Sequence, residues 1–170
     1  MMAKVLPALK YDELLLKYNL IEPQYPSWVD TNHYGLCLRA VRYLPKGTIV
    51  ATADFQETDK QFIANSSDPE YKYVALSRIN SDRTPIYSRI RGKWAFCNHS
   101  CDPNCDLSDT WQIITNRAVE QGQELTTAYD SYVLNFPWQD TWSFECLCDA
   151  LHCKKLIKEY RHDILYPKIE

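Results

Sequence analysis

Glycine is scarce in this chain of 170 residues, which contains only Gly35, Gly47, Gly92 and Gly122. None of the four belongs to a GxGxxG or GxxxxGK[ST] motif, so neither a dinucleotide-binding turn nor a nucleotide P-loop is expected. The GxSxG motif of serine hydrolases and the HExxH motif of zinc proteases are missing as well. The motifs of these four enzyme classes are therefore absent from the sequence.

Long apolar runs and a strong charge of either sign are also lacking. No stretch approaches the roughly 20 apolar residues of a membrane helix, and residues 1–10 lack the apolar segment of a secretory signal. Nineteen basic and 22 acidic residues give a net charge of −3 and a pI near 5.8, without a basic tail or stripe. We therefore expect one domain with small extensions that binds neither a membrane nor nucleic acid directly.

Cysteine, by contrast, is abundant. The odd count of seven argues against a disulfide framework and predicts an intracellular reducing compartment, cytoplasmic or nuclear. Three thiols form a CxCx4C cluster at Cys146, Cys148 and Cys153. Zinc takes four nitrogen or sulfur ligands, and four thiolates leave no position for water, so a structural metal is favoured. The candidates for the fourth ligand are Cys101, Cys105 and His152. Cys37, Cys97 and Cys105 read as small core residues.

Short β-like segments dominate the chain after Trp28. Helices are expected only at Tyr11–Leu20 and, as a short closing element, at Lys154–Tyr160. Residues 55–70 are polar and read as a surface excursion. The expected strands are Leu36–Val41, Thr48–Ala53, Tyr71–Leu76, Trp111–Val119 and Glu124–Tyr129. This pattern predicts a mostly β domain of small sheets.

Several specific strings then occur in a fixed order. NHSCDPNC spans residues 98–105, GQELTTAY spans 122–129, and the CxCx4C cluster follows; upstream lie YGL at 34–36 and a PKG turn at 45–47. Together they resemble a SET domain with a post-SET zinc motif, over roughly residues 28–157. The resemblance implies the SET-domain fold: several small β-sheets with a C-terminal pseudoknot, short helices and a zinc-binding post-SET tail.

The same resemblance implies a division of the chain. It assigns residues 1–27 to an N-terminal helical extension, 28–136 to the SET domain, 137–160 to a post-SET zinc-binding segment and 161–170 to a C-terminal tail. The implied activity is that of a protein-lysine N-methyltransferase, which moves a methyl group from S-adenosylmethionine to the ε-amine of a protein lysine. A histone tail is among the implied substrates.

Site residues follow from the resemblance position by position. Tyr129 matches the family's active-site tyrosine. Contacts to the cofactor are implied for His33, Tyr34, Gly35, Leu36, Tyr73, Asn98 and His99. Cys101 matches the fourth ligand of one structural zinc ion, beside Cys146, Cys148 and Cys153. The zinc would pin the C-terminal tail and so close the cofactor pocket and the lysine channel.

Two positions depart from the family's pattern. His33 stands where the first glycine of the opening loop is usual, and Thr127 stands where an aromatic residue often precedes the tyrosine by two positions. The first departure motivates an alternative reading as a catalytically silent, zinc-stabilised binding module. The lack of an accompanying targeting module leaves another alternative, a SET-fold enzyme that acts on a small molecule.

Overall fold

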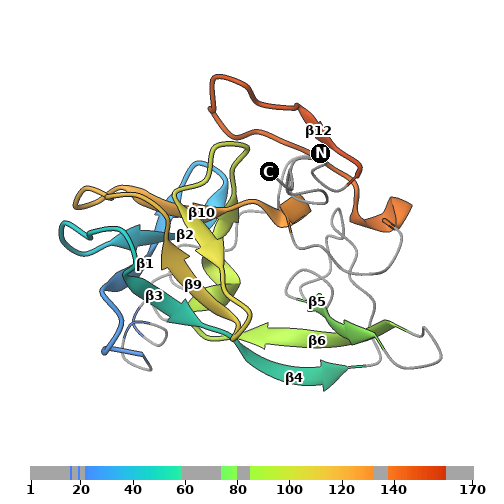
Figure 1. The fold of residues 1–170 in the computed structure, drawn as a ribbon, viewed down its shortest axis with the longest axis horizontal. Coiled ribbons are helices and arrows are strands. Elements are labelled where there is room, and N and C mark those ends of the chain that lie inside the picture. Colours follow the sequence, from blue (N-terminus) through green and yellow to red (C-terminus); the bar gives the residue numbers. More distant parts are fainter. Residues whose placement is uncertain are drawn as a thin grey trace, which may run out of the picture. The chain divides into compact units, whose positions relative to one another are not determined.

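In a computed structural model of the chain, short strands are joined by turns and by single turns of 3-10 helix (Figure 1). The structure describes Leu16, Asn19 and residues 22–58, 74–79, 85–131 and 138–159. The expected mostly β architecture of several small sheets is confirmed. The chain forms two compact units, each from three segments: Met1–Phe55, Ile90–Asn98 and Pro103–Thr127 in the first, and Gln56–Arg89, His99–Asp102 and Ala128–Glu170 in the second.

The largest sheet contains four strands in the order β1-β2-β10-β7. These are β1 (Ser27–Asn32), β2 (Gly35–Ala40), β10 (Glu124–Thr127) and β7 (Asn98–His99). β1 and β2 pair without interruption from Ser27↔Ala40 to Asn32↔Gly35, so a tight turn at residues 33–34 joins them. β10 lies antiparallel to β2, with Leu125 opposite Leu38. The sheet therefore brings together the turn at residues 33–34, the motif that begins at Asn98 and the motif that contains Glu124.

Two further sheets have three strands each. One has the order β3-β9-β8 and consists of β3 (Ile49–Thr52), β9 (Gln112–Thr115) and β8 (Cys105–Leu107). The other has the order β4-β6-β5 and consists of β4 (Asp54–Thr58), β6 (Pro85–Arg91) and β5 (Val74–Ile79). β4 is not among the expected strands, because a polar strand with little burial carries no apolar alternation to reveal it. Its exposed residues agree with a surface position at the start of residues 55–70.

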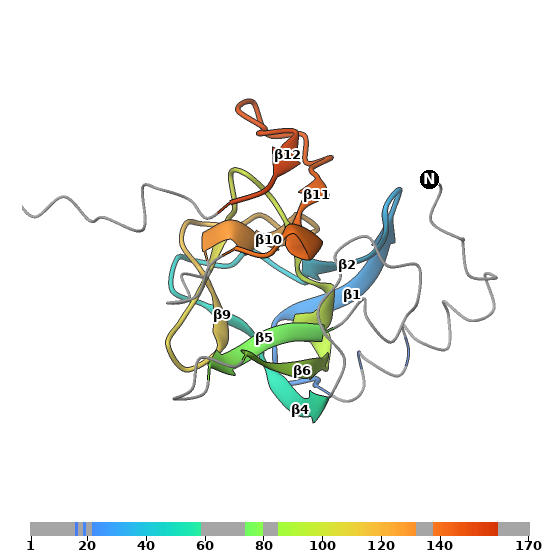
Figure 2. The ribbon, with the colours of Figure 1, turned by 90° about the vertical axis from the view of Figure 1, so that its right-hand side faces the viewer.

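The described C-terminal part is a small hairpin. After η2 (Tyr129–Ser131) and η3 (Asp140–Trp142) come β11 (Phe144–Glu145) and β12 (Leu156–Ile157), which pair antiparallel (Figure 2). The closing helix expected at Lys154–Tyr160 is therefore wrong in its described part. Here the N–H of Cys146 donates to the carbonyl of Lys155 at 2.8 Å, and Lys155 itself has a φ of 63°. Tertiary pairing thus overrides local helix preference.

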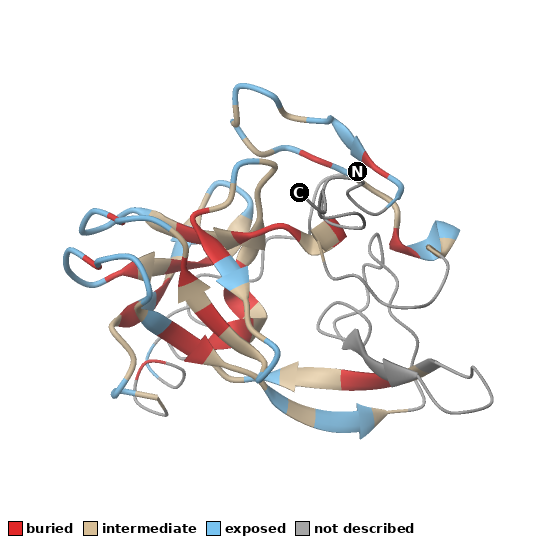
Figure 3. Cartoon of the chain, in the orientation of Figure 1, coloured by how far each residue is buried: buried red, intermediate tan, exposed pale blue. Residues whose placement is uncertain are grey.

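Apolar side chains of the first unit form its core. Alternation along β10 buries Leu125 and Thr127 and leaves Glu124 and Thr126 only half-buried (Figure 3). The buried side chains from the two sheets include Val29, Leu38, Val50, Ile113 and Leu125, each at most 1% exposed. Burial of this apolar surface is the main stabilising term, at about 25 cal/mol per Å². Because of this alternation, the side chain of Glu124 lies beside the core rather than in it and can form polar contacts.

A buried lysine ties the beginning of the first unit to η1 (Lys93–Phe96). Lys93 is 1% exposed, and its ammonium donates to the carbonyl of Ser27 at 2.7 Å. Its backbone N–H donates to a carboxylate oxygen of Glu22. Burial lowers the pKa of Lys93, while the charge of Glu22 raises it. Gly92, with φ of 75°, leaves room for that carboxylate, since a Cβ there would lie 2.6 Å from a Glu22 oxygen.

The N-terminal segment is described only at two positions. Of the helix expected at Tyr11–Leu20, Leu16 and Asn19 are described, and both have helical backbone. The Asn19 amide both donates to the carbonyl of Val29 at 3.0 Å and accepts from its N–H at 2.8 Å, so it pairs with the edge of β1 as a strand would. Among the described residues, no helix has the length and apolar character to cross a bilayer.

Candidate functional site

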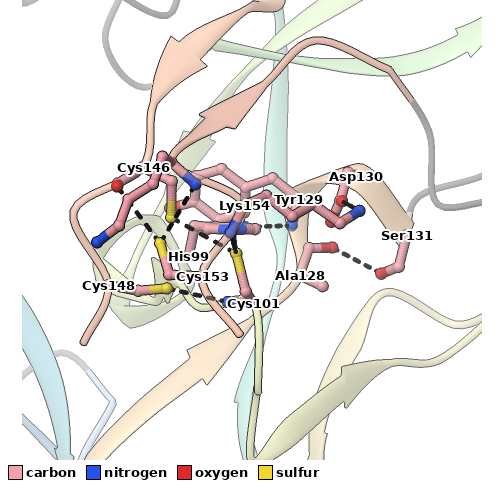
Figure 4. A network of polar contacts seen from close by, with 11 residues as sticks. His99, Cys101, Ala128, Tyr129, Asp130, Ser131, Cys146, Cys148, Cys153 and Lys154 are labelled. Atoms are coloured by element: carbon pink, nitrogen blue, oxygen red, sulfur yellow. Dashed lines mark hydrogen bonds and ion pairs between the residues drawn. The ribbon is translucent and has the colours of Figure 1, made fainter. Parts of the chain in front are cut away.

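Four cysteines gather in the second unit, although one of them comes from a different part of the sequence. The sulfur atoms of Cys101, Cys146, Cys148 and Cys153 all lie within 4.8 Å of one another (Figure 4). Four sulfurs bound to one tetrahedral zinc ion would lie roughly 3.8 Å apart, given a Zn–S bond of about 2.3 Å. The donor set is therefore the right kind, number and size for a closed, structural zinc site. All four are free thiols.

Backbone N–H groups surround the sulfur atoms. The N–H of Cys101 donates to the sulfur of Cys148 at 3.3 Å, and that of Lys154 donates to the sulfur of Cys101 at 3.4 Å. Burial raises the pKa of the Cys101 and Cys146 thiols. Burial also raises the pKa of Cys148, but hydrogen bonds from the N–H groups of Cys101 and Ala150 and from two neighbouring thiols outweigh it and bring the pKa to about 7. The thiolate, the form that binds metal, is thus favoured at Cys148, whereas burial favours the protonated thiol at Cys101 and Cys146.

The remaining cysteines lie outside this cluster. Cys37, Cys97 and Cys105 are buried in the first unit, in agreement with their reading as core residues. Burial raises the pKa of Cys37 to about 11 and that of Cys105 to about 12, so both are protonated at neutral pH. His152 is exposed, and it is not part of the cluster of four sulfurs.

An aromatic cluster adjoins the cysteines within the second unit. The ring centroids of His99, Tyr129 and Phe144 lie 5.3 to 5.9 Å apart, with the His99 ring edge-on to the other two. The N–H of Tyr129 donates to Nδ1 of His99 at 3.0 Å. This bond makes Nδ1 an acceptor, so a neutral ring carries its proton on Nε2. Nε2 lies 3.5 Å from the sulfur of Cys101, so His99 bridges Tyr129 and the cysteine cluster.

Sequence reasoning assigns no role to Phe144. It also does not predict that His99 bridges Tyr129 and the cysteine cluster. The sequence shows an aromatic-rich stretch at residues 132–144, but spacing alone does not single out Phe144. Its position at the start of the C-terminal hairpin does so, because β11 leads directly into Cys146. The same hairpin thus supplies a candidate metal ligand and an aromatic side chain beside it.

A second contact joins the cysteine loop to η2. Asp130 follows Tyr129 and is 1% exposed; one of its carboxylate oxygens accepts from the ammonium of Lys154 at 2.7 Å. Its other oxygen, Oδ1, is buried without a hydrogen-bond partner among the residues that the structure describes. Lys154 directly follows the ligand candidate Cys153. The ion pair therefore braces the helical turn that carries Tyr129 against the cysteine loop.

Replacing Lys154 by methionine is expected to lower the free energy of unfolding by about 1–3 kcal/mol, because the Asp130 carboxylate would stay buried without its cation. The effect belongs in this range rather than above it because the Lys154 side chain is 43% exposed. Urea denaturation of the metal-loaded protein measures it, with Lys158→Met on the same exposed tail as the matched control. Equal stability of the two variants would show that the brace contributes nothing.

Except for Tyr73, the other predicted site residues lie in the first unit, where the structure brings two groups of them together. His33 and Tyr34 form the exposed turn between β1 and β2, with ring centroids 3.6 Å apart, and Gly35 and Leu36 begin β2. Asn98 is half-buried, and its Nδ2 donates to the carbonyl of Leu36 at 3.2 Å. The turn and the NHSC string are thus joined directly. Tyr73 lies outside the described residues.

Comparison with known families and proteins adds an independent finding. The family model described as "SET domain" matches residues 35–130. The chain is 31% identical over 132 residues to Histone-lysine N-methyltransferase 2D of Homo sapiens, and 32% identical over 122 residues to an H3 lysine-4 specific histone-lysine N-methyltransferase of Aspergillus oryzae. These matches cover 71% and 67% of this chain, but only 2% and 9% of the relatives.

Among solved structures, the fold is similar to that of the methyltransferase domain of human Histone-lysine N-methyltransferase SETMAR. The TM-score is 0.54 at 18% sequence identity, and the match covers 76% of this chain and 56% of the other. At this identity the likeness concerns the fold, and it agrees with the expectation of a SET-type arrangement of small sheets.

Proposed function

The chain belongs to the SET-domain family, and on this basis we propose that it transfers a methyl group from S-adenosylmethionine to the ε-amine of a protein lysine. The observation that carries the proposal is the cluster of Tyr129, His99 and Phe144 beside the four cysteines. Curated relatives named as histone-lysine methyltransferases make a histone tail the first substrate to test. A nuclear site of action follows from the same proposal.

Two groups would be held by residues with suitable chemistry. Cys101, Cys146, Cys148 and Cys153 would hold zinc, which would supply no reaction step because four thiolates fill its coordination sphere. For the cofactor, Asn98 offers a half-buried amide whose Oδ1 has no partner in the described part of the chain. The turn at residues 33–36 adjoins that amide and offers backbone groups. The bound cofactor supplies a methyl group on a sulfonium, an electrophile that needs no acid for activation.

The chain's own residues have three tasks in this reaction. They hold the amine in line with the methyl carbon, they exclude water, and they stabilise positive charge as it moves from sulfur to nitrogen. The nitrogen lone pair forms the new N–C bond, the S–C electron pair stays on sulfur, and the amine proton leaves to water. The Tyr129 hydroxyl would orient the amine, and the faces of Tyr129 and Phe144 would favour the spread positive charge.

The test is calorimetric titration with S-adenosylmethionine, followed by transfer of a labelled methyl group to a histone mixture and to a cell lysate. We expect binding, and ε-N-methyl-lysine in the hydrolysed protein product. Absence of cofactor binding by zinc-loaded protein would favour the silent binding module instead. Label recovered only in small molecules would favour the small-molecule enzyme.

The rate of transfer is expected to rise with pH between 7 and 9. Only the neutral amine has a lone pair, and a free lysine has a pKa of about 10.4, so the reactive fraction grows close to tenfold per pH unit below that value. Desolvation in the channel lowers this pKa and moves the plateau to lower pH. Single-turnover rates at each pH measure the chemical step. A flat profile under these conditions would contradict the mechanism.

A further inference from the structure

The carboxylate of Glu124 joins two segments that are far apart in the sequence. Its Oε1 accepts from Nδ2 of Asn98 at 2.9 Å, and its Oε2 accepts from Nδ2 of Asn32 at 2.9 Å. All three residues belong to the first unit and are half-buried. Asn32 lies 92 positions before Glu124 and Asn98 lies 26 before it. A single side chain therefore fixes the end of β1 relative to β7.

Asn32 and Asn98 connect Glu124 to the turn at residues 33–36, which is predicted to contact the cofactor. Oδ1 of Asn32 accepts from the N–H of Tyr34 at 2.8 Å, which holds the turn between β1 and β2. The second hydrogen on Nδ2 of Asn98 goes to the carbonyl of Leu36 at 3.2 Å, at the start of β2. The turn, Asn32, Glu124 and Asn98 thus form a ring of hydrogen bonds that closes at Leu36.

The ring also fixes the polarity of Asn98. Both Nδ2 hydrogens are used on acceptors, while Oδ1 has no partner within the described ranges. A flipped amide would place its oxygen against a carboxylate and a carbonyl, both of which repel it, so Glu124 sets the orientation. Glu124 forms no ion pair in the described part of the chain, because Arg39, its partner across β2 and β10, pairs with Asp30 instead. A free amide oxygen beside a carboxylate suits a cationic donor.

We propose that Glu124 is a positioning residue for the cofactor: it sets the turn at residues 33–36 and turns the acceptor oxygen of Asn98 toward the α-ammonium group of S-adenosylmethionine. This inference rests on the proposed function, because it assumes that this cofactor binds here. Glu124 does not itself need to touch the ligand. Its effect is on affinity for the cofactor, which depends on preorganisation of both elements, and not on the methyl-transfer step.

The first test is calorimetric titration of the full, zinc-loaded chain with S-adenosylmethionine. Glu124→Gln keeps the size of the side chain. Its oxygen can accept from only one of the two asparagine amides, and its NH₂ group faces the other amide as a second donor. We expect about tenfold weaker binding, close to the loss of one charge-assisted hydrogen bond. Glu120→Gln is the matched control, because Glu120 is exposed and its side chain forms no hydrogen bond or ion pair among the described residues. In turnover, the cofactor KM should rise while kcat stays within about twofold.

A second measurement separates positioning from a general loss of structure. Wild-type protein and Glu124→Gln are titrated with S-adenosylhomocysteine and with its analogue that lacks the α-amine. The wild type should prefer the amine-bearing ligand, and the variant should lose most of that preference. An equal loss of affinity for both ligands would overturn the proposed orientation. If Glu124→Gln does not fold, Asn32→Ser removes the link between Glu124 and the turn, leaves the bond between Glu124 and Asn98 in place, and should weaken binding in the same direction.

The outcomes distinguish this inference from the function on which it rests. No binding of S-adenosylmethionine by the wild type would overturn the proposed function, and the positioning role with it. Binding by the wild type, with both glutamine variants equal to it, would overturn the positioning role alone.

Discussion

Replacement of Tyr129 by phenylalanine should lower kcat for methyl transfer by about 10²–10³-fold, the typical cost of removing one hydrogen-bonding group from a transition state. The change deletes only the hydroxyl. The N–H bond to His99 and the ring contacts to His99 and Phe144 do not involve that hydroxyl and should persist. Cofactor affinity should therefore stay within about twofold, and the loss should appear in single-turnover rates with labelled methyl donor.

Tyr43→Phe is the matched control, because Tyr43 is 53% exposed and lies in the first unit, away from this cluster in the sequence. It should leave the rate unchanged. A Tyr129→Phe variant with full activity would remove the tyrosine from the mechanism. A variant that instead lost cofactor binding would assign Tyr129 to the binding step.

Removal of zinc by a chelator, or the substitution Cys148→Ser, should reduce methyl transfer to near background. Without the ion, four sulfur atoms within 4.8 Å of one another have no common partner to hold their loops together. Zinc binding contributes on the order of 10 kcal/mol to small zinc-dependent folds, so its loss should unfold the loop between β11 and β12. His99 contacts Cys101 directly, so disorder in that loop should also weaken cofactor binding.

Three measurements check this expectation: zinc content per chain, limited proteolysis within residues 144–157, and cofactor titration. Leu151→Ser is the control in the same loop, since Leu151 lies between two ligands and is 91% exposed. It should keep its zinc and its activity. Equal proteolysis and equal cofactor affinity with and without the chelator would show that the metal does not organise the site.

Apolar alternation made much of the fold predictable from the sequence. The expected strands at residues 36–41, 48–53 and 124–129 overlap β2, β3 and β10, whose buried residues alternate or cluster as a half-buried sheet requires. β4 was missed because its DFQET sequence is polar and mostly exposed. β12 was missed because two residues paired across a hairpin leave no periodic signal.

The candidate site likewise has parts that the sequence predicts and parts that it does not. The grouping of the four cysteines was predictable because ligand chemistry restricts both residue type and spacing. The role of Asn98 at the cofactor, inferred from the motif around it, stays a prediction. The link between Asn32 and Glu124 spans 92 positions and depends on strand register, which a single sequence does not encode locally. The ion pair of Asp130 and Lys154 depends likewise on how the C-terminal loop packs. Motifs thus locate reactive groups, whereas tertiary contacts orient them.

The split origin of the cysteine cluster has a consequence for biosynthesis. Cys101 leaves the ribosome 45 residues before Cys146, an interval of roughly 2–9 s at a translation rate of about 5–20 residues per second. During that time the thiol of Cys101 has none of its three sulfur neighbours. A nascent chain stalled in this window would expose Cys101 to oxidants without the other members of its cluster, and ribosomes that pause after residue 101 should yield more oxidised and less active protein.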